Sequence, residues 1–206
     1  MPKLAAFTSK GLSLALLMAL CVILPAAGQT SDSIPWNADR PLVWADFQCT
    51  PPADAIHRNE PAAIHMTIHW RVSYSASSAT GSTWMGRVGN TEVTNVMSPK
   101  LSWAVPGKVD ALILLHEQAH FDLNEVYRRK VERALLCVQA QGVSQQGVLD
   151  ALKAQVHNVA NALLNRLVEV QAQYDDETQH GVNRAMQVHW QEQIARWLLD
   201  PAGAPS

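Results

Sequence analysis

The segment Leu112-Ile-Leu-Leu-His-Glu-Gln-Ala-His-Phe-Asp-Leu123 lies near the start of a long helical pattern, residues 109–141. The charged residues of this pattern fall roughly opposite an apolar stripe. An imidazole without a partner is costly to bury, so histidines on the stripe need an explanation. At 100° per residue the stripe contains Leu112, His116, Ala119, His120, Leu123, Tyr127 and Ala134.

The two histidines belong to His116-Glu117-Gln118-Ala119-His120, the His-Glu-x-x-His pattern of zinc hydrolases. Residues four apart on a helix lie one turn above each other, so both imidazoles can bind one Zn²⁺. Glu117 points about 100° away from His116, which keeps it from the metal but close to a water on it. The pattern predicts His116 and His120 as zinc ligands and Glu117 as the general base. A core helix with two satisfied histidines is the alternative, and it leaves Glu117 unexplained.

Before residue 106 the sequence consists of short segments in which apolar and polar residues alternate. The clearest strand candidate covers residues 64–74, and residues 42–47 form another. Two more candidates lie between Thr83 and Met97, separated by turn residues that include Gly89-Asn90. These segments predict a small antiparallel sheet.

Two further helices are predicted, over residues 145–173 and 182–199. The last six residues, 201–206, follow them and are expected to form a disordered tail. The predicted fold class is therefore α+β, a small N-terminal antiparallel sheet followed by three helices, with the metal motif on the first long helix.

A catalytic zinc commonly takes three protein ligands, so the sequence should contain a third. If the second helix returns antiparallel to the first, Glu169 comes level with His116, but it points away from the apolar stripe and is expected to face water. The polar segment 174–181 follows directly, and we expect the third ligand there. Its candidates are His180, Asp175, Asp176 and Glu177. Tyr174 ends the apolar stripe, and its hydroxyl is a candidate to stabilise an oxyanion beside the metal.

Length and composition fit one packed domain, since the chain has 206 residues of which 48% are hydrophobic and 17% charged. The formal net charge is -2, which gives no electrostatic reason to expect binding to nucleic acid or to an anionic membrane.

The first 28 residues are typical of a signal peptide, with early lysines, a short apolar run and small residues at its end. We therefore expect a secreted or periplasmic protein whose mature domain covers residues 29–200, with no stable membrane association after the signal is removed. Cleavage leaves Cys49 and Cys137, which in an oxidising compartment either form a disulfide or remain free thiols.

Separate blocks of the sequence, in order, carry a family resemblance between about Leu42 and Leu198. They are Val43-Trp-Ala-Asp-Phe47, Ser102-Trp103, His116-Glu-Gln-Ala-His-Phe-Asp122, and Tyr174-Asp-Asp-Glu-Thr-Gln-His-Gly181 with Gln187 and Trp190. The chain resembles bacterial proteins described as predicted secreted zinc-dependent proteases, a family otherwise called a domain of unknown function. The resemblance implies a secreted metallopeptidase of zincin-like fold. It also favours His180 as third ligand, because the family carries a His-Gly at this point.

The expected function is hydrolysis of peptide bonds in a peptide or protein substrate, with Zn²⁺ held by His116, His120 and His180. Two alternatives remain open. One is a secreted binding or structural protein whose zinc site is closed by a fourth protein ligand. The other is a zinc hydrolase that acts on a different amide, such as one in the cell wall.

Overall fold

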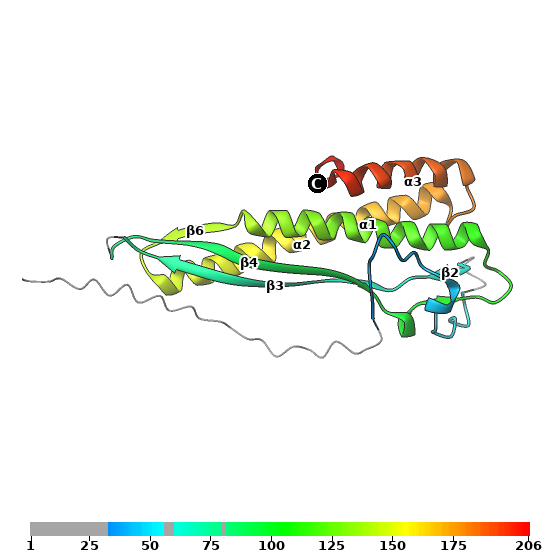
Figure 1. Cartoon of the computed structure of the whole chain (residues 1–206), viewed down its shortest axis with the longest axis horizontal. Helices are drawn as coiled ribbons and strands as arrows, with labels where there is room; N and C mark the ends of the chain where they lie inside the picture. The colour runs from blue at the N-terminus through cyan, green and yellow to red at the C-terminus, as the bar shows by residue number, and fades with distance from the viewer. Residues whose placement is uncertain (1–32, 56–59, 80) are drawn as a thin grey trace, which may run out of the picture.

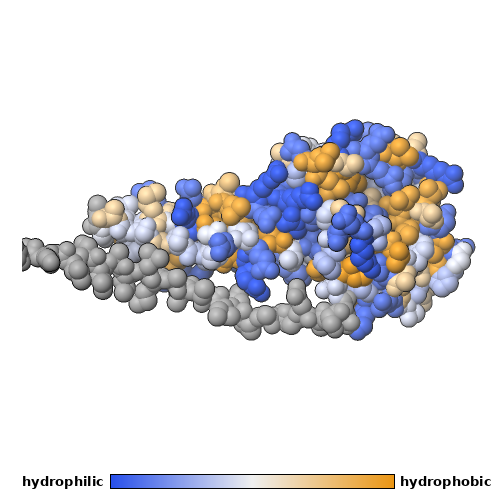
Figure 2. Space-filling model, viewed as in Figure 1, coloured by the Kyte–Doolittle hydropathy of each residue, from blue (hydrophilic) through white to orange (hydrophobic). Residues whose placement is uncertain are grey.

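The computed structural model describes residues 33–55, 60–79 and 81–206 (Figure 1). The predicted signal peptide, residues 1–28, lies outside the described residues. Among the described helices, none is long and apolar enough to cross a membrane. Figure 2 shows a slender end of the molecule and a broader end, with hydrophobic and hydrophilic residues interspersed on the visible face.

The main sheet is built on a long antiparallel hairpin of β3 (Met66–Ser77) and β4 (Trp84–Met97). The other edge of β4 pairs with β1 (Ile34–Pro35) near one end and with β6 (Gln139–Gly142) near the other. Within the described residues, β3 is therefore an edge strand. A second, two-stranded antiparallel sheet joins β2 (Ala62–Ala63) to β5 (Trp103–Ala104).

The alternation predicted for residues 64–74 is present in β3, whose apolar side chains pack on the core while the residues between them are exposed. The two strands expected between Thr83 and Met97 form one strand instead. Gly89 and Asn90 together lie opposite Ser73 as a bulge, and the Asn90 N–H donates to Ser73 Oγ at 2.8 Å. The bulge absorbs the turn residues without ending the strand.

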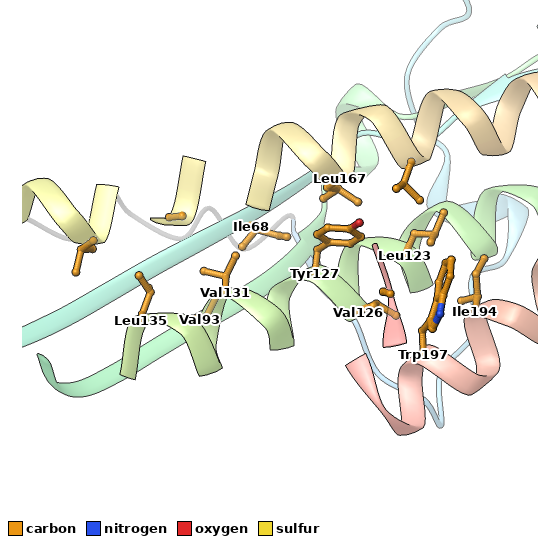
Figure 3. Packing of buried hydrophobic residues seen from close by; sticks show 14 of the residues in the cluster. Ile68, Val93, Leu123, Val126, Tyr127, Val131, Leu135, Leu167, Ile194 and Trp197 are labelled. Carbon is orange, nitrogen blue, oxygen red and sulfur yellow. The ribbon is translucent and has the colours of Figure 1, made fainter. Parts of the chain in front are cut away.

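Three α-helices are present in the described part of the chain: α1 (Ala111–Leu136), α2 (Gln145–Thr178) and α3 (Arg184–Leu199). Helix α1 contacts β4, α2 and α3, and Figure 1 shows it between α3 and the hairpin. Its middle is buried nearly all round, which is typical of a central helix. Figure 3 shows the resulting core, with Leu123 and Tyr127 of α1 among side chains of the other elements. The fold is α+β, as predicted.

Two segments differ from the sequence-based expectation and change the sheet. The first helix ends at Leu136 rather than near residue 141, and β6 follows it, so the sheet is not confined to the N-terminal part. Residues 42–47 form no strand but contain a 3₁₀ turn, Trp44–Asp46. The buried Asp46 carboxylate holds this turn, because it accepts from the Val43 N–H and pairs with Arg40.

The end of α2 also differs from the prediction, because the helix continues to Thr178 rather than stopping near residue 173. Gln179, His180 and Gly181 then turn the chain with positive φ angles of 50°, 52° and 84°. A Cβ on Gly181 would lie 3.0 Å from Cβ of His116, so this turn packs directly against α1.

Residues 201–206 were expected to be disordered, but they pack on α1 after a 3₁₀ turn, Pro201–Gly203. Lys130 Nζ donates to the carbonyl of Ala204 at 2.6 Å and to that of Pro205 at 2.8 Å. A buried ammonium requires such acceptors, and the tail supplies them. Cys49 and Cys137 are free thiols in this structure.

Candidate metal centre

Two helices bring three potential ligand atoms together. His116 and His120 lie one turn apart on α1, and Asp175 lies in the last turn of α2. The two Nε2 atoms are 3.1 Å apart, and Asp175 Oδ1 lies 3.1 Å from Nε2 of His116 and 2.9 Å from Nε2 of His120. These three residues form a possible metal-binding triad, and within the described residues no other such group is found.

The contacts of Gln171 fix the tautomer of His120. Gln171 Nε2 donates to the backbone carbonyl of His120 at 3.1 Å, so the amide oxygen is the atom that contacts the ring Nδ1. An oxygen can only accept, so Nδ1 must carry a hydrogen. The neutral ring therefore has its lone pair on Nε2, the atom that faces Asp175.

The ring of His116 is held in the same way by Gln187. The Tyr174 hydroxyl accepts from Gln187 Nε2 at 2.7 Å, and it can donate either to Gln187 Oε1 at 3.0 Å or to the His116 backbone carbonyl at 3.3 Å. This places Gln187 Oε1 against Nδ1 of His116, at 3.2 Å. The Tyr174 ring also stacks on the imidazole, with centroids 4.6 Å apart. His116, like His120, therefore presents Nε2 to the triad.

The triad thus joins two imidazole lone pairs and a carboxylate oxygen, all of which are acceptors. A cation among them, either a shared proton or a metal ion, removes their mutual repulsion. Burial lowers the pKa of His116, which favours its neutral, metal-binding form. Burial disfavours the charged form of Asp175, but protonated His116 and His120 donate hydrogen bonds to it, and these outweigh burial and lower the pKa of Asp175 well below its usual value.

Glu117 lies beside the triad without belonging to it. Its side chain is buried, and Oε2 accepts from the Ile64 N–H at 3.0 Å. Burial raises the pKa of Glu117 to about 7. A carboxyl group with this pKa can both accept and release a proton near neutral pH.

The triad and Glu117 line one pocket of about 540 Å³. One wall is the extended segment Glu60–Ile68, and another is α2, from Leu164 to Asp175. Helix α1 contributes His116, Glu117, His120 and Asn124. The metal-binding atoms are therefore accessible from a cavity that has an extended chain along its side.

The other predicted residues lie around this centre. His180 lines the pocket with a side chain that is 44% exposed, and its Nδ1 is 3.5 Å from Asp175 Oδ1. Its assignment as third ligand stays a prediction, whereas Asp175, one of the alternatives, is the residue brought into the triad. Tyr174 is fully buried, is not among the residues that line the pocket, and contacts the His116 backbone carbonyl through its hydroxyl, so its role beside the metal stays a prediction. Glu169 faces solvent, as predicted, and pairs with Arg166.

Sequence reasoning missed the roles of Gln171 and Gln187. The signal for Gln171 was its spacing, since Gln171 and Asp175 lie four apart on α2, as His116 and His120 do on α1. Because the two helices are antiparallel, His116 meets Asp175 and His120 meets Gln171. Gln187 lay within the resemblance but had no predicted role.

No curated protein and no solved structure matched the chain in comparisons with each set. A family model, described as a bacterial protein of unknown function (DUF922), matches residues 50–181, a span that contains the triad and Glu117. The chain thus belongs to the DUF922 family of bacterial proteins.

Proposed function

We propose that this protein is a secreted, zinc-dependent peptidase with a zincin-like site. The observation that carries the proposal is the convergence of His116 Nε2, His120 Nε2 and Asp175 Oδ1 in a pocket that also contains the buried carboxyl group of Glu117. Two imidazole nitrogens and one carboxylate oxygen are a common ligand set for catalytic zinc.

The residues present fit zinc in two respects. Both imidazoles are oriented by glutamine side chains so that Nε2 faces Asp175, and the site opens to a pocket in which water and substrate can bind. When bound there, zinc supplies a Lewis acid that polarises a carbonyl group and acidifies a water molecule.

Glu117 acts as general base and then general acid. It removes a proton from the attacking water, whose oxygen forms a bond to the carbonyl carbon of the peptide. As the carbon–nitrogen bond breaks, Glu117 passes that proton to the leaving amine. The hydrogen bond from the Ile64 N–H holds Oε2 of Glu117, which orients the carboxyl group for both transfers.

With Asp175 as third ligand, His180 takes a different role. Its ring lines the pocket next to Asp175 and is partly exposed, so it is placed to donate a hydrogen bond to the substrate carbonyl. The extended segment Glu60–Ile68 provides a wall along which an extended peptide binds.

A structural zinc site is the competing function, and it would need a fourth protein ligand. His180 could supply one, because its Nδ1 lies 3.5 Å from Asp175 Oδ1. Spectroscopy of the coordination shell of the zinc-loaded chain distinguishes the two, because a catalytic site keeps water in one position.

Glu117→Gln tests the catalytic role directly. The variant should bind one zinc per chain and keep its fold, while peptide hydrolysis falls at least about 100-fold. Glu192→Gln, which changes an exposed carboxyl group on α3, should retain full activity. Equal activity of wild type and Glu117→Gln would remove Glu117 from the mechanism, and a wild type active only on cell-wall amides would replace the peptide substrate.

A further inference from the structure

Asn124 is a polar side chain in the candidate pocket that the proposed mechanism does not use. It lies on α1 one turn beyond His120, it is 5% exposed, and it lines the pocket. Four residues of helix advance about 6 Å, so Asn124 lies one to two peptide residues away from the metal-binding atoms.

A chain of hydrogen bonds fixes which atom Asn124 presents. Asn95 Nδ2 donates to the backbone carbonyl of Phe121 at 3.3 Å, so Asn95 Oδ1 must be its acceptor toward Asn124. Asn124 Nδ2 donates to that oxygen at 3.0 Å. Asn124 Oδ1 is left with no hydrogen-bond partner among the described residues. This oxygen is not one of the fully buried, unpaired side-chain atoms of the described residues, so it is open to the pocket, where a ligand N–H can donate to it.

The residues around Asn124 are apolar. The contacts of His116 and His120 with Asp175 and Gln171 set α1 and α2 antiparallel, which brings the Leu164–Val168 turn level with Asn124. Ile68 pairs with Asn95, the partner of Asn124, and Ile68 and Leu167 belong to the same hydrophobic cluster and line the same pocket. This part of the pocket is lined by Ile68, Leu164, Leu167 and Val168.

We propose that Asn124 binds substrate, accepting a hydrogen bond from a substrate N–H beside a subsite for an aliphatic side chain. The subsite is formed by Ile68, Leu164, Leu167 and Val168. This inference rests on the proposed function for the position of the scissile bond. The subsite should favour peptides with a leucine-like residue within one or two positions of the scissile bond, because its lining carries no charge to bind a polar side chain.

Hydroxamates test the subsite without turnover, because they bind a catalytic zinc reversibly. The probes are acetohydroxamate and two series of peptide hydroxamates, and their affinities are measured on the zinc-loaded full chain. One series places the variable residue on the amino side of the hydroxamate and the other on its carboxyl side. In each series that residue is either glycine or leucine. In one series leucine should bind at least about tenfold more tightly than glycine, as expected for burial of an isobutyl group.

Two variants assign this preference to residues. Val168→Lys, at a valine that is 67% exposed, should reduce the leucine-to-glycine ratio to near one. Val182→Lys is the matched control, since Val182 is 63% exposed and does not line the pocket, and it should keep the ratio. Asn124→Ala should weaken the peptide hydroxamates several-fold while acetohydroxamate, which lacks the further amide N–H, binds as to wild type.

The outcomes separate this inference from the proposed function. Equal affinity for leucine and glycine in both series, or an equal loss of all probes in Asn124→Ala, would overturn the subsite even if the chain hydrolyses peptides. A leucine preference that depends on Val168 in a chain that hydrolyses nothing would establish the subsite and refute the peptidase.

Discussion

Nε2 of His120 lies 2.9 Å from Oδ1 of Asp175, although 55 residues separate the two along the chain. This contact joins the middle of α1 to the last turn of α2. Because both atoms are acceptors when the ring is neutral, a cation strengthens the contact between the helices. A metal ion bound by the triad would therefore also hold α1 and α2 together.

Zinc should therefore stabilise the protein. A ligand that binds only the folded state adds about 4 kcal/mol at a concentration 1,000 times its dissociation constant. We expect one zinc per chain after reconstitution, and a lower melting temperature when a chelator removes it. Elemental analysis with scanning calorimetry measures both. Absence of metal after reconstitution at neutral pH would refute the metal centre.

The third ligand is tested by three alanine variants. Asp175→Ala should lower zinc affinity by more than about 100-fold, which exceeds the usual effect of residues that only support ligands. His180→Ala should have a smaller effect, and Glu169→Ala should have none, because Glu169 faces solvent. Competition with a fluorescent chelator measures all three. If His180→Ala causes the largest loss, the ligand set expected from the sequence is correct and Asp175 is a supporting residue.

The two glutamines should tune metal affinity through the imidazoles. Gln171→Leu and Gln187→Leu each remove the acceptor of an Nδ1 hydrogen, and we expect each to weaken zinc binding about 10 to 100-fold. Gln173→Leu on the exposed side of α2 is the control, since Gln173 contacts Glu177 and not the triad. Chelator titration would contradict the tautomer argument if all three variants behaved alike.

The sequence predicted the part of the site that depends on local geometry. His116 and His120 lie four apart on one helix, so their convergence follows from helical spacing alone. Whether Asp175 comes level with these histidines depends instead on where α2 begins and ends. Helix α1 ends 20 residues after His116, whereas Asp175 lies 30 residues after the start of α2.

The ten-residue difference arises because β6 carries the chain outward along β4 before α2 begins. A short strand with the sequence Gln-Ala-Gln-Gly has no strong β pattern, so its pairing depends on tertiary contacts with the hairpin. Dependence on strand pairing also explains why the Gly89-Asn90 bulge was predicted as a break between two strands. Its residues are typical of a turn, and only the register against Ser73 shows that the strand continues.

Gly181 gives a test of how the turn after α2 positions His116. Its φ of 84° is unfavourable for any residue with a Cβ, and that Cβ would also lie 3.0 Å from Cβ and 3.3 Å from Cγ of His116. Gly107 is a matched control, because its φ is 76° and a Cβ there would meet nothing within 4 Å.

Alanine at either glycine should cost about 1 to 2 kcal/mol of unfolding free energy from the backbone conformation alone. Gly181→Ala adds a contact that displaces either the turn or the His116 ring, so it should be the less stable variant and bind zinc at least about tenfold more weakly. Gly107→Ala should bind zinc like wild type. Urea unfolding and chelator competition measure the two quantities separately. Equal zinc affinities in the two variants would mean that the ring of His116 is held by Gln187 and Tyr174 alone, since the turn could then move without displacing it.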